Sequence, residues 1–156
     1  MGLFSNNKND NLLDKISEPY IENGFTISKS VGLRFPGEYF FVDTEHKKFA
    51  YTNQAKYKNN EITIYEFKDL LKYTANKANT PNGSRSYGLL GGISTSTNTT
   101  NKYEITLYIN SLDIDKSSIK LLDWVFNSNS IDGISGKTEK IYNELIPVLE
   151  YILNNK

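Results

Sequence analysis

The sequence has no cysteine and only one histidine, and these two absences exclude several kinds of chemistry. Without cysteine the chain has no disulfide, no thiolate nucleophile and no cysteine zinc site. The one histidine, His46, belongs to the polar segment 43–47, which we expect to be an exposed hairpin loop. Acid–base catalysis normally needs a tuned histidine or paired carboxylates, and no such motif is evident. We therefore predict a protein that is not an enzyme and uses no metal or cofactor.

Arginine is also scarce, and the chain carries no net charge. Its two arginines are Arg34 and Arg85, although arginine is the side chain best suited to bidentate recognition of phosphates and bases. Eighteen basic residues balance eighteen acidic ones, so no long-range field draws the protein to nucleic acid. Nucleic-acid binding is therefore disfavoured. The lysines between positions 47 and 68 leave a weak basic surface for lipid headgroups open as an alternative.

Apolar runs long enough for a signal peptide or a membrane span are missing as well. Residues 1–8 contain no apolar core, and Glu150 interrupts the apolar stretch near the C-terminus. These features predict a cytoplasmic location, with peripheral membrane contact as the alternative. The many Lys, Asn and Ile residues are typical of an AT-rich coding genome, and so of a low-GC bacterium or a mobile element.

What the sequence does contain is enough apolar and aromatic material for one folded domain. The chain has 156 residues, of which 38% are hydrophobic and 13% aromatic, too many for a disordered chain. Residues 1–24 are expected to form a polar lead-in followed by a short helix that Pro19 limits. The single domain is expected to span 25–156.

Within this domain, apolar residues recur at every second position over several short segments, as in half-buried strands. One helical turn is expected at 65–70, and polar loops at 53–60 and 113–118. A polar loop at 43–47 makes a hairpin of the two segments that flank it. The expected strands are residues 25–35, 39–42, 48–52, 62–64, 71–75, 103–109 and 119–126.

The C-terminal segment has the period of an amphipathic helix. Ile141, Leu145, Leu149 and Ile152 share one helix face, and the helix is expected to begin near Thr138 and pack on the sheet. Pro147 lies inside this pattern and removes one helical hydrogen bond. The segment is therefore expected to be either a kinked helix or two shorter helices.

Two polar tracts, 76–86 and 94–101, lack large apolar side chains and are expected to be exposed loops. Between them, 87–93 is apolar but rich in glycine, which fits either a bent edge strand or a close approach of the backbone to a ligand. No Gly-Lys-Ser/Thr follows, so this is not a phosphate loop. The candidate binding residues of this region are Arg85, Tyr87, Gly88, Gly91 and Gly92.

Aromatic residues are concentrated in the hairpin 39–52, which invites comparison with a base-stacking platform. A half-buried antiparallel sheet uses the same residue types, and basic residues are not interleaved with these aromatics. The aromatic hairpin is therefore predicted to belong to the core.

Short sequence features also suggest a family. The succession of about seven strands and a final helix, with the segments 41–43, 62–71 and 145–153, resembles small bacterial pleckstrin-homology-like (PH-like) proteins. The resemblance implies an α+β, mainly β fold, in which a PH-like antiparallel barrel or sandwich is closed by the C-terminal helix. It also implies a non-enzymatic scaffold that binds peptides, proteins or lipids, and it assigns no binding residue.

Together these features predict a binding module that contacts a protein partner, through residues 84–100 or through an open sheet edge. Two alternatives stay open at this point: peripheral binding to anionic membrane lipids, and binding of a small ligand or nucleotide. Edge strands and the aromatic hairpin also leave a symmetric homodimer open.

Overall fold

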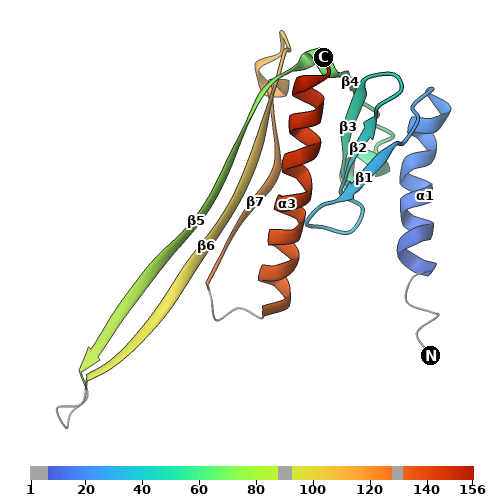
Figure 1. The fold of residues 1–156 in the computed structure, drawn as a ribbon. Coiled ribbons are helices and arrows are strands. Elements are labelled where there is room, and N and C mark those ends of the chain that lie inside the picture. Colours follow the sequence, from blue (N-terminus) through green and yellow to red (C-terminus); the bar gives the residue numbers. More distant parts are fainter. Residues whose placement is uncertain (1–6, 88–92, 128–131) are drawn as a thin grey trace.

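A computed structural model describes residues 7–87, 93–127 and 132–156 of the chain (Figure 1). It is an α+β fold, as predicted, and its strands form two antiparallel sheets, one of four strands and one of three. Figure 1 shows α3 beside the second sheet and α1 at the far side of the first. The elements are α1 (Asn7–Glu22), β1 (Lys29–Gly32), β2 (Tyr39–Asp43), β3 (Lys48–Thr52), α2 (Gln54–Lys58), β4 (Ile64–Glu66), the 3-10 helix η1 (Phe67–Asp69), β5 (Leu70–Tyr87), β6 (Ile93–Ile109), the 3-10 helix η2 (Ile114–Lys116), β7 (Ser118–Asn127) and α3 (Asp132–Asn154).

The first sheet, with strand order β1-β2-β3-β4, is covered on both faces. Phe40, Val42 and Phe49 face the main core, whereas Phe41 and Ala50 pack with residues of α1. Alternate side chains of a strand point to opposite faces, so a strand buried on both faces reads as a continuous apolar run. This confirms that the aromatic hairpin belongs to the core.

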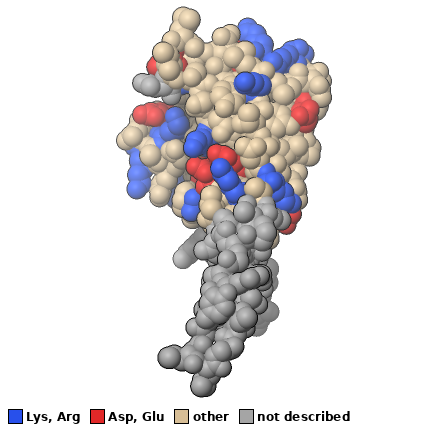
Figure 2. Space-filling model, turned by 90° about the vertical axis from the view of Figure 1, so that its left-hand side faces the viewer, with Lys and Arg blue, Asp and Glu red and all other residues tan. Residues whose placement is uncertain are grey.

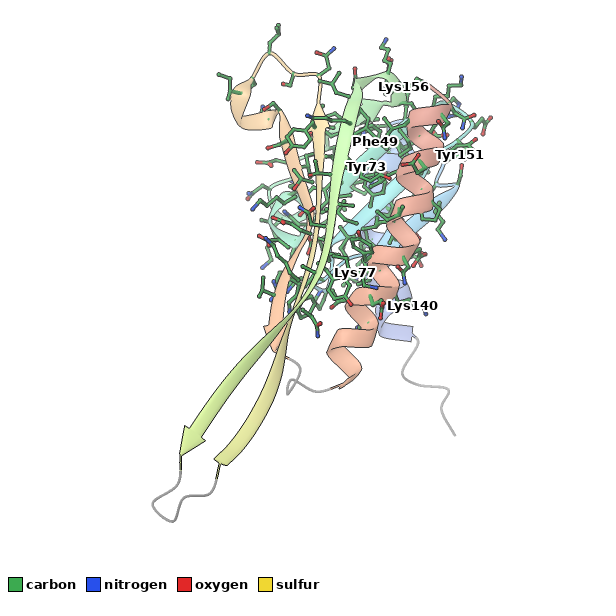
Figure 3. All side chains as sticks on the ribbon, turned by 60° about the vertical axis from the view of Figure 1, so that its left-hand side comes forward. Phe49, Tyr73, Lys77, Lys140, Tyr151 and Lys156 are labelled. Atoms are coloured by element: carbon green, nitrogen blue, oxygen red, sulfur yellow. The ribbon has the colours of Figure 1, made fainter. Side chains whose placement is uncertain are left out.

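The second sheet, with order β5-β6-β7, supplies the other wall of the main core. Tyr103, Ile105, Leu107 and Ile109 of β6 are all buried, which confirms the strand expected there. Figure 3 shows Tyr73 and Lys77 of β5 on the side of α3, where they bond to Glu150 and Glu139 respectively. The hairpins β2–β3 and β6–β7 and the helical turn at η1 are also confirmed.

The two long helices, α1 and α3, each run through a proline, contrary to two of the expectations. The helix α1 contains Pro19 and continues to Glu22, so the proline does not limit it. α3 is one helix that begins at Asp132 and contains Pro147, so it starts six residues before Thr138. In each helix the buried stripe continues past the proline, and burial of several large side chains outweighs one lost hydrogen bond. In α3 these side chains are Leu145, Leu149 and Ile152, each with no exposed surface.

The expected strand 25–35 is mostly not a strand, since only Lys29–Gly32 forms β1. Phe25 and Ile27 pack in the cluster around α1, whereas Val31 and Leu33 pack in the main core. The segment therefore passes from one face of the first sheet to the other, and Lys29 lies at the crossing. Its amine is 2.9 Å from a carboxylate oxygen of Glu144 in α3.

The expectation of loops at 76–86 and 94–101 was wrong, because both tracts lie in long strands. β5 and β6 stay in register from Lys72↔Tyr108 to Tyr87↔Ile93. β7 ends at the pair Thr100↔Asn127, and beyond it β5 and β6 continue as a two-stranded ribbon that projects from the body (Figure 1). A ribbon outside the core needs no apolar face, so the alternation that identifies buried strands is absent from its sequence. The expected loop 53–60 likewise contains a helix, α2.

We expect Leu145→Ala to lower the free energy of unfolding by about 2 to 5 kcal/mol, because it leaves a cavity among side chains that cannot fully collapse. Leu145 has no exposed surface and packs in the main core. Urea denaturation followed by circular dichroism measures the change. Asn143→Ala, on the exposed face of the same helix, is the matched control and should change stability by less than about 0.5 kcal/mol. Equal losses in both variants would contradict this account of the core.

Candidate functional site

A groove of about 760 Å³ lies where the two sheets fail to meet. One wall is formed by residues around β4, including Ile62, Thr63 and Tyr65, and the other by residues 118–120 at the start of β7. β4 is hydrogen-bonded to β3 and β7 to β6, and each is the last strand of its sheet. Within the described ranges no strand pairing joins the two sheets. The described strands therefore form no closed barrel, and the PH-like barrel that the resemblance implies stays a prediction.

Lysines dominate the charged lining of the groove. Lys56, Lys116 and Lys120 line it, and Glu61 is the acidic residue among the described lining residues. Each amine has a carboxylate nearby, at 3.9 Å for Glu61, 3.8 Å for Asp113 and 3.3 Å for Asp123 respectively. Such long, solvent-exposed ion pairs contribute little and are readily exchanged for a better partner. The lining itself thus carries three lysines and one glutamate, and carboxylates at its rim pair with the lysines.

Apolar and aromatic side chains form the rest of the lining. Ile62, Ile119, Tyr51 and Tyr65 contribute their surfaces to it. The hydroxyl of Tyr51 donates to a carboxylate oxygen of Glu38 at 2.9 Å. Burial raises the pKa of Tyr51 to about 12, and the negative charge of Glu38 adds to this effect although Asn53 opposes it. Tyr51 therefore stays protonated at any physiological pH and its aromatic ring remains an uncharged part of the wall.

Of the residues proposed from the sequence as a binding site, the two that the structure describes do not line this groove. Arg85 and Tyr87 are in the part of β5 that forms the ribbon, far from η2 and the start of β7 (Figure 1). Gly88, Gly91 and Gly92 lie outside the described residues. The groove itself was missed because its residues come from three separate segments. In the sequence these appear as ordinary strand ends and surface lysines.

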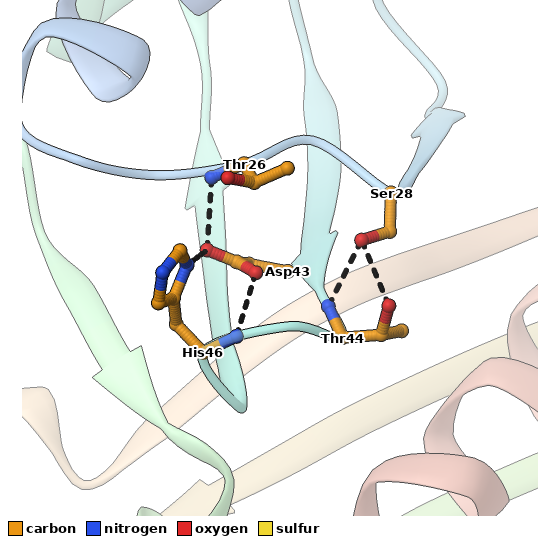
Figure 4. Close-up of polar contacts among 5 residues, drawn as sticks. All are labelled: Thr26, Ser28, Asp43, Thr44 and His46. Carbon is orange, nitrogen blue, oxygen red and sulfur yellow. Dashed lines mark hydrogen bonds and ion pairs between the residues drawn. The ribbon is translucent and has the colours of Figure 1, made fainter.

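The single histidine serves the fold. His46 lies in the β2–β3 loop with a half-exposed side chain, and its Nδ1 atom donates to Asp43 at 2.8 Å (Figure 4). Asp43 is fully buried and also accepts the backbone N–H groups of His46 (2.9 Å) and Thr26 (2.8 Å). Asp43 therefore ties the segment after α1 to the hairpin loop. A second link joins Ser28 to Thr44 through two hydrogen bonds.

Charge elsewhere on the described surface is mixed. Figure 2 shows Lys and Arg side chains interspersed with Asp and Glu over one face of the molecule. On the outer face of the second sheet, Lys102 pairs with Glu104. Among the described residues no cluster of His, Asp and Glu could hold a metal ion. No described helix is long and apolar enough to cross a membrane.

Comparison with known proteins adds no family assignment. No protein-family model, curated protein or solved structure matches the chain. The PH-like resemblance therefore stays a prediction, and the site has to be interpreted from its own geometry.

We expect Asp43→Asn to destabilise the protein by about 1 to 3 kcal/mol at neutral pH, because the amide group cannot accept all three hydrogen bonds. Burial alone would raise the pKa of Asp43, but the hydrogen bonds from Thr26 and His46 hold it below its ordinary value. A carboxyl whose pKa is lower in the folded state stabilises that state above about pH 4 and loses this effect on acidification.

The difference between the Asp43→Asn variant and the unaltered protein should therefore shrink as the pH falls below about 4. Urea unfolding at a series of pH values measures it. Asp14→Asn, at an exposed position of α1, serves as the control. A destabilisation that does not change with pH would show that the charge of Asp43 is not what stabilises the loop.

Proposed function

We propose that the protein is a non-enzymatic binding module that takes an extended, acidic segment of a protein partner into the groove between β4 and β7. One observation carries this proposal: two sheet edges flank a groove whose charged lining is three lysines and one glutamate. A strand edge offers backbone N–H and C=O groups that an added strand can satisfy. The groove offers two such edges to a single occupant.

Strand addition explains why the gap suits a peptide better than a small metabolite. Main-chain hydrogen bonds to the edges would provide affinity, and alternate side chains of the peptide would face the walls. Acidic side chains would meet Lys56, Lys116 and Lys120, while apolar ones would meet Ile62 and Ile119. Charge complementarity of this kind mainly speeds association and selects among partners. The expected ligand is therefore extended, acidic and free of proline.

The arrangement of the fold supports the same proposal. Two antiparallel sheets and a C-terminal helix are what the PH-like resemblance implies, and that family's architecture serves as a scaffold for peptides, proteins or lipids. In this chain α3 packs against both sheets, through contacts with β1 and with β5 to β7. The helix thus occupies one opening of the sandwich, and the groove is the other.

The proposal is tested by selecting binders from a random heptapeptide display library. We expect enrichment of acidic sequences without proline, and we expect the double variant Lys116→Glu/Lys120→Glu to bind them about tenfold or more weakly. Lys15→Glu/Lys72→Glu makes the same change of charge at exposed positions of α1 and β5 and should leave binding unchanged. Thermal melting of both variants verifies that they fold. Binding that the two double variants weaken equally would refute the groove as the site.

An anionic membrane surface is a second candidate for what the protein binds, and one specific observation favours it. Leu112 and Ile114, in the β6–β7 loop, are 107% and 86% exposed, and Lys116 of the groove follows them closely. Exposed apolar side chains beside a basic residue are typical of loops that enter the headgroup region. Asp113 lies between the two apolar residues, however, so this loop itself brings little positive charge.

For this second candidate we expect the protein to float with phosphatidylserine-containing vesicles at low salt and to dissociate as salt rises. Leu112→Ser/Ile114→Ser should abolish flotation. Ile21→Ser/Val125→Ser removes two exposed apolar side chains elsewhere, 55% and 56% exposed, and should have no effect. Absence of flotation at low salt would exclude the membrane candidate and leave the peptide groove untouched.

A further inference from the structure

The two edges of the β5–β6 ribbon differ in a way that bears on self-association. β7 pairs with one side of β6 as far as Thr100, which lies opposite Asn127 at the end of β7. From Ile93 to Thr99 β6 is paired with β5 on its other side. On the side of β6 that β7 occupies from Thr100 onward, no strand in the described part of the chain pairs with residues 93–99. Seven consecutive residues therefore present a free strand edge directly in line with β7.

The opposite edge of the ribbon, along β5, is protected. Pro81 has no N–H to offer, and proline in a sheet is confined to positions that face away from the neighbouring strand. Arg85 adds a charge on the same strand, and charged residues and proline are the usual means of preventing edge-to-edge pairing. By contrast, residues 93–99 read Ile-Ser-Thr-Ser-Thr-Asn-Thr, with no proline and no charge.

We propose that residues 93–99 of β6 pair antiparallel with the same residues of a second copy of the chain, with Ser96 opposite the partner's Ser96. A two-fold axis through this central pair brings seven residues of each chain together, about 24 Å of strand. In each copy, β7 occupies this edge of β6 from Thr100 onward, so the pairing cannot extend past residue 99. The product is a continuous four-stranded sheet, made from the ribbons of both copies.

Pairing with a second copy fits the composition of residues 93–99. Antiparallel pairing about Ser96 places Thr95 opposite the partner's Thr97 and Ser94 opposite the partner's Asn98, and polar pairs of this kind stabilise a sheet by hydrogen bonding. A two-stranded ribbon alone is marginally stable in water, and pairing with a second ribbon adds further backbone hydrogen bonds to it. Because the chain has no net charge, two copies approach without long-range repulsion.

Cysteine cross-linking tests the pairing directly, because the chain contains no cysteine of its own. Facing residues of antiparallel strands have Cα atoms about 4.5 to 5.5 Å apart, within the range of a disulfide. Ser96→Cys should therefore form a covalent dimer under mild oxidation. Ser84 is the cross-strand neighbour of Ser96 within one chain, and two strands would separate it from the partner's Ser84, by about 14 Å. Ser84→Cys is the matched control and should cross-link far less.

A charge exchange at the same position tests the two-fold axis. Ser96→Lys or Ser96→Glu puts like charges opposite each other and should raise the dimer dissociation constant about tenfold or more, as measured by sedimentation velocity. Mixing the two variants should restore a dimer, whereas the same changes at Ser84 should leave the dimer intact. A protein that stays monomeric up to its solubility limit would overturn the proposal, as would Ser84→Cys cross-linking as efficiently as Ser96→Cys.

These outcomes are separable from those for the groove, since Ser96 lies outside its lining. The double variant Lys116→Glu/Lys120→Glu should dimerise normally. Conversely, loss of the dimer in Ser96→Lys should leave the affinity for a single monomeric peptide unchanged. A result in which both properties fail together would point to misfolding, which thermal melting of the same samples detects, and would remove support from the pairing.

Discussion

Burial of β2 on both of its faces is the constraint on which the other elements depend. Phe40, Phe41 and Val42 are consecutive and at most 1% exposed, so they need apolar partners on opposite sides of one sheet. Burying each such side chain is worth about 1.5 to 3 kcal/mol, and neither face can be left to solvent at that cost. One face is covered by Ile16 and Tyr20 of α1. The other is covered by β6, β7 and α3, whose buried residues belong to the main core.

This double burial also explains where the sandwich stays open. α3 packs on both sheets along one side, and its residues Leu145 and Leu149 complete the main core. α1 is committed to the outer face of the first sheet. No described element remains to cover the gap between β4 and β7. The lysines and tyrosines of the groove therefore line a site between the edge strands of the two sheets.

Much of the core was predictable from the sequence, and the reasons are local. The buried strand 103–109 and the C-terminal helix follow from apolar periodicity, because each has one face that must be apolar. The β2–β3 hairpin follows instead from the polar loop 43–47 between two apolar segments. The ribbon was not predictable in this way, since nothing requires alternation in strands outside the core. The predictions that Pro19 limits α1 and that Pro147 kinks or divides α3 failed for a related reason. A proline acts locally, whereas tertiary packing decides whether a helix continues. The groove joins residues 51–65 to 116–120, and no local pattern links them.

The ribbon has a further consequence for how this protein can change. Because its strands pair residue by residue beyond β7, one residue can be lost from each strand without shifting the register of the rest. Removing Gly83 together with Thr97, for example, would shorten the ribbon by one step of about 3.4 Å and leave every core contact in place. The length of the ribbon can therefore change by whole residue pairs while the packing of the body stays the same.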